Sequence, residues 1–118
     1  MDTLNLQERQ QLIDALRALQ IELKSFIESL AEATATVELD QGQQGRLSRI
    51  DAMQSQKMAQ AQKRRAEQRL ERVSNILAAS DEDSFGCCGD CEEPIPIQRL
   101  LARPDAVLCV ECAAQRQR

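Results

Sequence analysis

The chain has 118 residues, a formal net charge of -4, 29% charged residues, two Phe, and no His, Trp or Tyr. So few aromatic residues argue against a conventional globular core and favour long solvated helices beside a small module. The negative charge argues against a protein that coats nucleic acid, because phosphate binding relies on clustered Lys and Arg. No apolar run approaches the length of a membrane span, and no basic-then-apolar signal segment follows Met1, so a cytoplasmic protein without membrane contact is expected.

An unbroken heptad pattern predicts a first long helix over residues 5–37. The candidate N-cap residues are Asp2, Thr3 and Asn5, and no Gly or Pro interrupts the run before Gly42. The apolar seam has gaps of four and three and consists of Leu12, Leu16, Leu19, Leu23, Phe26, Leu30, Ala33 and Val37.

A turn is expected at residues 38–45, where the period is lost and two glycines occur. A second helix is expected over 46–79, with a weaker seam at Ala52, Gln56, Ala59, Lys63, Ala66, Leu70, Val73 and Leu77. Together the two helices predict an antiparallel coiled-coil hairpin in which the numbers of facing residues add up to about 82, so that Leu23 faces Ala59. Parallel dimerisation through the first helix is the competing use of the heptads, and a monomer is expected.

Four cysteines in the last third form two pairs, Cys88-Gly-Asp-Cys91 and Cys109-Val-Glu-Cys112, with seventeen residues between them. This spacing predicts one structural Zn²⁺ per chain, held by the thiolates of Cys88, Cys91, Cys109 and Cys112. Four thiolates leave no open position for water, and without His no imidazole can act as ligand or base, so the chain is not expected to be an enzyme. Two disulfides are the alternative, but they require an oxidising compartment.

The fifth cysteine, Cys87, directly precedes a predicted ligand. It is interpreted as a small half-buried neighbour of the site. The alternative is a spare thiol that replaces a ligand or reacts with oxidants. The predicted organisation is therefore a hairpin at 1–79, an acidic joint at 80–86, and a four-cysteine module at 87–118 that ends in a short helical tail from Ala113.

This organisation resembles the DksA/TraR family of bacterial transcription factors. The matching stretches are Asp83-Ser84-Phe85-Gly86-Cys87-Cys88-Gly89-Asp90-Cys91, Ile95-Pro96-Ile97-Gln98-Arg99-Leu100-Leu101-Ala102-Arg103-Pro104 and Val107-Leu108-Cys109-Val110-Glu111-Cys112. The resemblance implies a regulator that binds RNA polymerase without binding DNA and inserts its coiled coil into the secondary channel. It also implies guanosine tetraphosphate as a co-regulator.

The resemblance also suggests residues at two further sites. The family's tip motif, Asp-x-x-Asp-x-Ala, is absent, and its nearest equivalents are Asp40 and the pair Asp51-Ala52. Arg65, Arg72 and Arg103 correspond to basic nucleotide-contacting residues of the family, whereas Ala113 stands where nucleotide-responsive members have a basic residue. Two other functions remain open, an adaptor that docks a different cytoplasmic partner and a thiol-based redox sensor.

Overall fold

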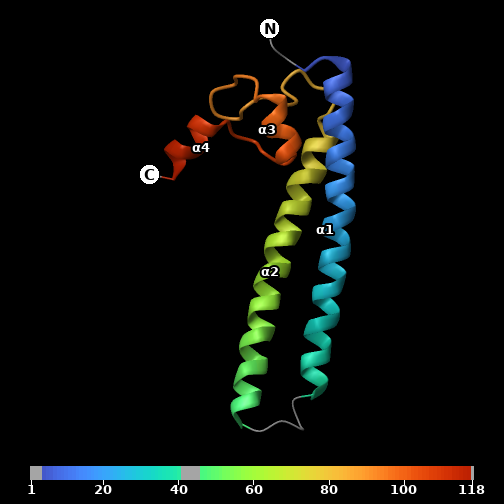
Figure 1. Cartoon of the computed structure of the whole chain (residues 1–118), viewed down its shortest axis with the longest axis vertical. Helices are drawn as coiled ribbons and strands as arrows, with labels where there is room; N and C mark the ends of the chain where they lie inside the picture. The colour runs from blue at the N-terminus through green and yellow to red at the C-terminus, as the bar shows by residue number, and fades with distance from the viewer. Residues whose placement is uncertain (1–3, 41–45, 118) are drawn as a thin grey trace. The chain divides into compact units, whose positions relative to one another are not determined.

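The computed structural model describes residues 4–40 and 46–117, without the side chains of residues 33–40 and 46–48. The helices of this part are α1 (Leu6–Asp40), α2 (Arg46–Ala78), α3 (Ile97–Ala102) and α4 (Val110–Arg116) (Figure 1). Its β-structure consists of one isolated bridge between Cys87 and Pro94. The predicted class, a mainly α chain with two long paired helices and a small four-cysteine module, is confirmed. None of the described helices is both long and apolar enough to span a membrane.

Helix α1 begins with a capping box. The Asn5 side chain accepts a hydrogen bond from the Glu8 backbone N–H (2.7 Å), and the Glu8 carboxylate accepts one from the Asn5 N–H (3.1 Å). These two bonds satisfy donors that the first turn of a helix leaves without a partner. Asn5 is therefore the N-cap, while the other two candidates, Asp2 and Thr3, lie outside the described residues.

The helix ends differ from the sequence prediction by one to three residues. Helix α1 continues to Asp40, so residues 38–40 are helical and not part of the turn. No Gly or Pro occurs before Gly42, and nothing in the local sequence ends the helix earlier. Helix α2 ends at Ala78, one residue before the predicted end. The rest of the predicted turn, residues 41–45, lies outside the described residues.

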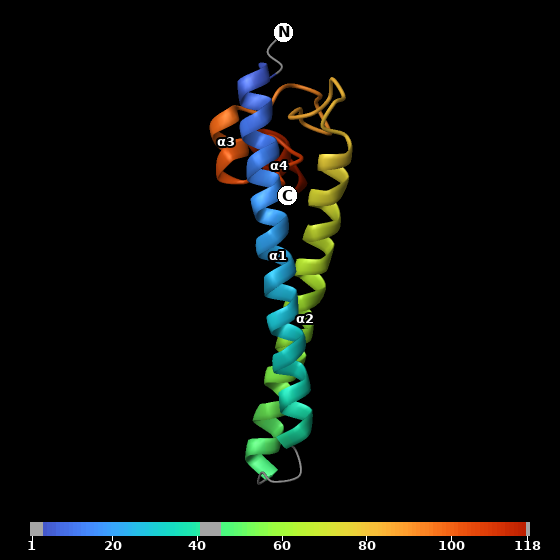
Figure 2. The same ribbon diagram turned by 90° about the vertical axis from the view of Figure 1, so that its right-hand side faces the viewer.

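The chain divides into two compact units, and each contains a segment of both long helices. The cysteine-containing unit comprises the described residues up to Gln20 and from Arg72 onward, and the two-helix unit comprises Ile21–Glu71. Two perpendicular views agree that α1 and α2 run side by side in opposite directions (Figures 1 and 2). The long helices therefore pair as an antiparallel hairpin.

The register of this pairing is about one heptad away from the predicted one. Gln20 Nε2 donates to Ser74 Oγ (3.2 Å), and a guanidinium nitrogen of Arg9 donates to the Ser80 carbonyl. Both pairs of residue numbers add up to more than the predicted 82. A register in which facing numbers add up to about 89 keeps every seam position opposite another and places Leu16 against Val73. These two side chains are 0% exposed.

The earlier register is wrong because it assumed a turn centred near residue 41. Helix α1 extends to Asp40 and α2 begins at Arg46, so the midpoint between the two described helices lies beyond residue 41. Since both helices are continuous, the same register pairs Leu23 with Ala66 in the two-helix unit, and not with Ala59. Leu23 and Ala66 are each 6% exposed.

Phe26 departs from its predicted place in the seam. It is 45% exposed, although Leu23 and Leu30 on either side of it are buried. Within Ile21–Glu71 the described residues form only two helices, which cover a narrow stripe of each other's surface. The Phe26 side chain therefore remains about half in solvent.

The cysteine-containing unit has a core to which both long helices contribute. Its fully or nearly fully buried apolar side chains are Leu12, Leu16, Val73, Phe85, Ile95 and Leu100. Arg9 of α1 lies over the Phe85 ring, 5.2 Å from its centroid, and also donates to the Glu82 carbonyl (3.4 Å). The start of α1 therefore helps to order residues 80–86, which the sequence analysis treated as a joint.

Gly86 shows why this segment requires a glycine. Its φ is +85°, in the left-handed region that L side chains rarely adopt. A Cβ built here would lie 2.9 Å from Leu4 Cδ1 and 3.6 Å from Leu100 Cδ1. The absent side chain thus permits both the turn and the close packing that leads to the cysteines.

Candidate metal centre

The first pair of cysteines lies on a tight turn stabilised by backbone hydrogen bonds. The Cys88 N–H donates to the Glu93 carbonyl (2.8 Å), and the Glu92 N–H donates to the Cys88 carbonyl (3.0 Å). Glu92 has a φ of 63°, which reverses the chain directly after Cys91. The Asp90 N–H donates to Cys88 Sγ (3.4 Å), so the backbone of the turn also orients a thiol.

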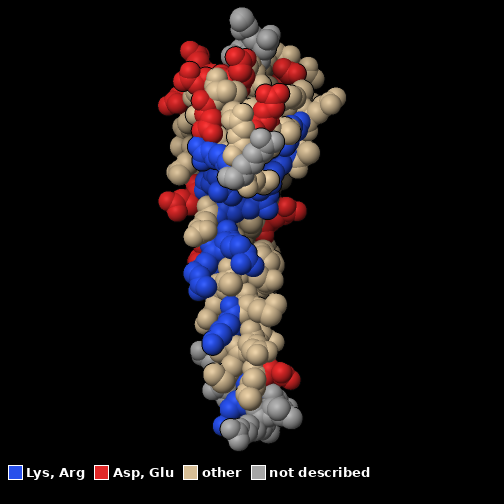
Figure 3. Space-filling model, turned by 90° about the vertical axis from the view of Figure 1, so that its left-hand side faces the viewer, with Lys and Arg blue, Asp and Glu red and all other residues tan. Residues whose placement is uncertain are grey.

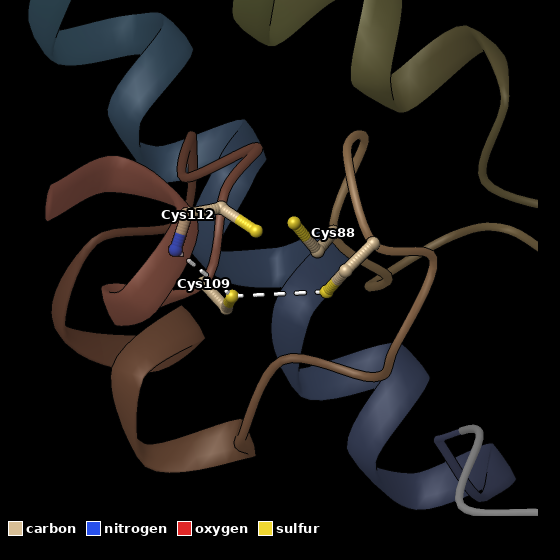
Figure 4. Close-up of side chains that lie close together, drawn as sticks. Cys88, Cys109 and Cys112 are labelled. Carbon is tan, nitrogen blue, oxygen red and sulfur yellow. Dashed lines mark hydrogen bonds between the residues drawn. The ribbon is translucent and has the colours of Figure 1, made fainter. Parts of the chain in front are cut away.

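The second pair lies at the start of α4. Cys109 is the N-cap residue, and its Sγ accepts a hydrogen bond from the Cys112 N–H (3.5 Å). The helix begins at Val110, three residues before the tail predicted from Ala113. Cys112 therefore occupies the first turn of α4 and points toward the same space as Cys109 (Figure 4).

The four thiols converge on a single point. The Sγ atoms of Cys88, Cys91, Cys109 and Cys112 all lie within 4.8 Å of one another, and those of Cys91 and Cys109 are 3.8 Å apart. A tetrahedral zinc with Zn–S bonds of about 2.3 Å requires sulfur atoms roughly 3.8 Å apart. The cluster fits this requirement and offers no fifth position, as expected for a structural Zn²⁺ site.

The surroundings of the thiols shift their proton affinities in different directions. Backbone N–H groups of Cys91 and Cys109 lower the pKa of Cys88 to about 6, because hydrogen bonds stabilise its thiolate. Hydrogen bonding with the Cys109 sulfur, followed by hydrogen bonding with Cys88, raises the pKa of Cys112. One sulfur is therefore predisposed to be a thiolate, while another has to lose its proton when it coordinates a metal.

Cys87 lies outside this cluster. It is half-buried, and its backbone forms the bridge to Pro94 and donates to the Ser84 carbonyl (3.0 Å). This position agrees with its interpretation as a neighbour of the first ligand.

An ion pair that the sequence analysis did not identify links the two cysteine segments. Arg116 Nε donates to Asp90 Oδ2 (2.9 Å), and a terminal nitrogen of the same guanidinium donates to Asp90 Oδ1 (2.6 Å). The hydrogen bonds and charge of Asp90 raise the pKa of Arg116, as do the nearby Cys112 and Cys88. Sequence gave no signal for this pair, because its members are 26 residues apart.

A second polar cluster lines a pocket of ≈ 210 Å³ in the same unit. The Asp105 side chain is 0% exposed. Its Oδ2 lies 3.3 Å from a terminal guanidinium nitrogen of Arg72, and its Oδ1 lies 3.9 Å from Arg103 Nε. Arg99 also lines the pocket and donates to the Leu108 carbonyl (3.3 and 3.4 Å). Two predicted nucleotide-contacting residues, Arg72 and Arg103, thus lie together at the pocket, whereas Arg65 is exposed on α2 within the two-helix unit and does not line it.

Arg99 and Asp105 were not among the site residues predicted from the sequence. A short helix, α3, brings Arg99 to the pocket. The available signal was the short spacing of Arg99 and Arg103, which are four residues apart; Arg99 lies in α3 and Arg103 is the C-cap residue directly after it.

The predicted tip residues are only partly described. Asp51 is exposed and Ala52 is half-buried, both in the second turn of α2. Asp40 is the last residue of α1, and its side chain lies outside the description.

Comparison with known proteins gives independent evidence on the cysteine module. Residues 83–118 match the family model of the prokaryotic dksA/traR C4-type zinc finger. The RNA polymerase-binding transcription factor DksA of Haemophilus influenzae is 44% identical over 43 residues, which are 36% of this chain and 30% of that protein. DksA of Escherichia coli K12 is 37% identical over 43 residues, 36% of this chain and 28% of that protein. The matched stretch thus spans less than a third of these relatives.

The fold is similar over nearly the whole chain. The structure of transcription factor DksA2 from Pseudomonas aeruginosa matches with a TM-score of 0.80 at 21% identity, covering 96% of this chain and 85% of that one. Residues 83–118 thus carry the C4-type zinc finger of the dksA/traR family, and the fold over nearly the whole chain is similar to that of DksA2.

Proposed function

We propose that the protein is a transcription regulator that binds bacterial RNA polymerase and inserts its α1–α2 hairpin into the secondary channel. The observation that carries this proposal is the combination of a dksA/traR zinc finger at residues 83–118 with the DksA2 fold. The curated relatives that share the finger are named RNA polymerase-binding transcription factors. Each long helix, with more than thirty residues, is roughly 50 Å long, which suits a probe that reaches into a deep channel.

The proposal includes binding to polymerase without direct contact to DNA. Lys and Arg side chains form a row along α2, and Arg49, Lys57 and Arg64 are exposed there (Figure 3). A row on one helix, in a chain with a net charge of -4 and no Trp or Tyr for base stacking, suits an acidic protein surface better than DNA. A mobility-shift assay with promoter DNA, with and without polymerase, tests this part.

The regulatory output is assigned to acids near the turn. The exposed Asp51 lies in the second turn of α2, with half-buried Ala52 beside it. A carboxylate at this end of the hairpin would act on the catalytic magnesium of polymerase or its ligands, since magnesium prefers hard oxygen donors. Asp40 is the secondary candidate.

Guanosine tetraphosphate is proposed to bind at the pocket between Arg72 and Arg103. Guanidinium groups suit bidentate phosphate contacts, and Arg99 adds a third beside them. The buried Asp105 carboxylate already pairs with Arg72, so a phosphate has to compete with it. Calorimetric titration of the protein–polymerase complex with the nucleotide tests the site: Arg72→Ala should abolish the binding heat, and Arg65→Ala, outside the pocket, should leave it unchanged.

The decisive experiment is in vitro transcription with purified polymerase, combined with a pull-down from a bacterial lysate. Under this proposal polymerase subunits co-purify with the protein and transcription from sensitive promoters changes. An adaptor for another partner would not retain polymerase. A redox sensor would change its output on mild peroxide treatment as zinc is released. Analytical ultracentrifugation checks the proposed monomer, and cell fractionation the cytoplasmic location.

A further inference from the structure

The ion pair between Asp90 and Arg116 connects the two cysteine segments that form the metal site. Asp90 is located between the two cysteines of the first pair, Cys88 and Cys91. Arg116 follows Cys112 by four residues on α4, so both side chains lie on the same helix face. The two hydrogen bonds, at 2.9 and 2.6 Å, join the carboxylate and the guanidinium in bidentate geometry.

Asp90 is connected to the thiol cluster through its own backbone as well. Its N–H donates to Cys88 Sγ (3.4 Å) while its carboxylate holds Arg116. One residue thus orients a sulfur of the first pair and binds the helix that carries a sulfur of the second. The neighbouring Gly89 N–H donates to the Val107 carbonyl (2.8 Å), a backbone bond that also joins the two segments.

Zinc release breaks the bonds from the ion to both cysteine pairs, and separation of the two pairs opens the site for this step. Each pair is held together by its own local turn, so separation takes place between the first turn and α4. The Asp90–Arg116 pair spans this division and has to break as the site opens. We propose that Asp90 and Arg116 form a latch that holds the two cysteine pairs together and slows zinc release.

If Arg116 affected zinc release only through its positive charge, the opposite result would be expected for the Asp90→Asn variant. Zinc with four thiolates carries net negative charge, and a nearby guanidinium favours that charge without any partner. Asp90→Asn removes the partner carboxylate and retains the Arg116 cation. If Arg116 acted only by its charge, Asp90→Asn would release zinc at the wild-type rate or more slowly.

The test measures zinc transfer from the zinc-loaded full-length protein to the chromogenic chelator 4-(2-pyridylazo)resorcinol in excess. Arg116→Gln and Asp90→Asn should each accelerate transfer about three- to tenfold. This is less than the roughly 10- to 100-fold typical of residues that support metal ligands, because the pair is partly exposed. The double variant should be no faster than the faster single variant, since both break the same pair. Gln115→Ala on α4 and Arg64→Gln on α2 serve as neighbour and charge controls and should transfer zinc at the wild-type rate.

Far-UV circular dichroism and zinc content before the chase show whether each variant is folded and loaded. Should Arg116→Gln lose helicity, Arg116→Lys is the second variant: it keeps the charge, loses the bidentate geometry and should still release zinc faster. Wild-type release by Asp90→Asn, or effects of the two single variants that add in the double variant, would overturn the latch.

Discussion

The seam of the hairpin is tested most directly at Leu16, whose side chain is 0% exposed. Leu16→Ala removes three carbon groups from the core at about 0.8 kcal/mol each, or about 2.4 kcal/mol, and leaves a cavity that adds to the loss. We expect the free energy of unfolding to fall by about 3 to 4 kcal/mol, within the range of buried Leu→Ala changes. For a chain of this size the melting temperature should then drop by roughly 10 to 15 °C.

The assay is urea unfolding followed by circular dichroism at 222 nm, with zinc in excess so that metal loading stays constant. Ile21→Ala is the matched control, because Ile21 is also an apolar residue of α1 but is 69% exposed. This substitution should lower the free energy of unfolding by only about 0.5 kcal/mol. If Leu16→Ala costs no more than Ile21→Ala, the assignment of the buried seam is wrong.

Double-mutant cycles extend this test to the register. In the observed register Leu16 faces Val73, so Leu16→Ala and Val73→Ala should show a coupling free energy of at least about 0.5 kcal/mol. Leu12 and Leu70 face each other only in the register predicted from the sequence, and their effects should be additive. Coupling between Leu12 and Leu70, together with additive effects at Leu16 and Val73, would show that the register predicted from the sequence is the correct one.

The remaining predictions concern the metal, one glycine and the tip. Metal analysis should find about one zinc per chain in Cys87→Ser and a substoichiometric amount in Cys88→Ser, because of these two neighbours only Cys88 belongs to the thiol cluster. Loss of zinc from Cys87→Ser would show that Cys87, and not Cys88, is the ligand. Zinc affinity should increase as the pH rises, because the raised pKa of Cys112 means that binding displaces a proton; calorimetry in buffers of different ionisation enthalpy measures that proton, and a pH-independent affinity would contradict the argument. Gly86→Ala should lower stability in urea by about 1 to 2 kcal/mol through its left-handed φ, and an unchanged midpoint would show that the turn tolerates a side chain. Asp51→Asn should preserve zinc content, melting temperature and polymerase affinity yet abolish the effect on transcription; full regulation by both this variant and Asp40→Asn would exclude the tip mechanism.

The sequence by itself determined the features that depend on short-range periodicity and spacing. Heptads at Leu12, Leu16, Leu23 and Leu30 predicted a helix seam, and the structure buries all four. The two Cys-x-x-Cys pairs predicted a single thiol cluster, and their sulfurs converge. In both cases neighbours three or four residues apart share one face or one turn, so local geometry carries the information.

Tertiary structure decided everything that depends on how distant segments meet. Heptads repeat, so a shift of one heptad leaves every seam position opposite another, and only contacts such as Gln20–Ser74 distinguish the registers. The burial of Asp105 against Arg72 and the pairing of Asp90 with Arg116 join residues 33 and 26 positions apart. An isolated Asp or Arg carries no periodic signal, and its partner is determined only by the packing that brings the two segments together.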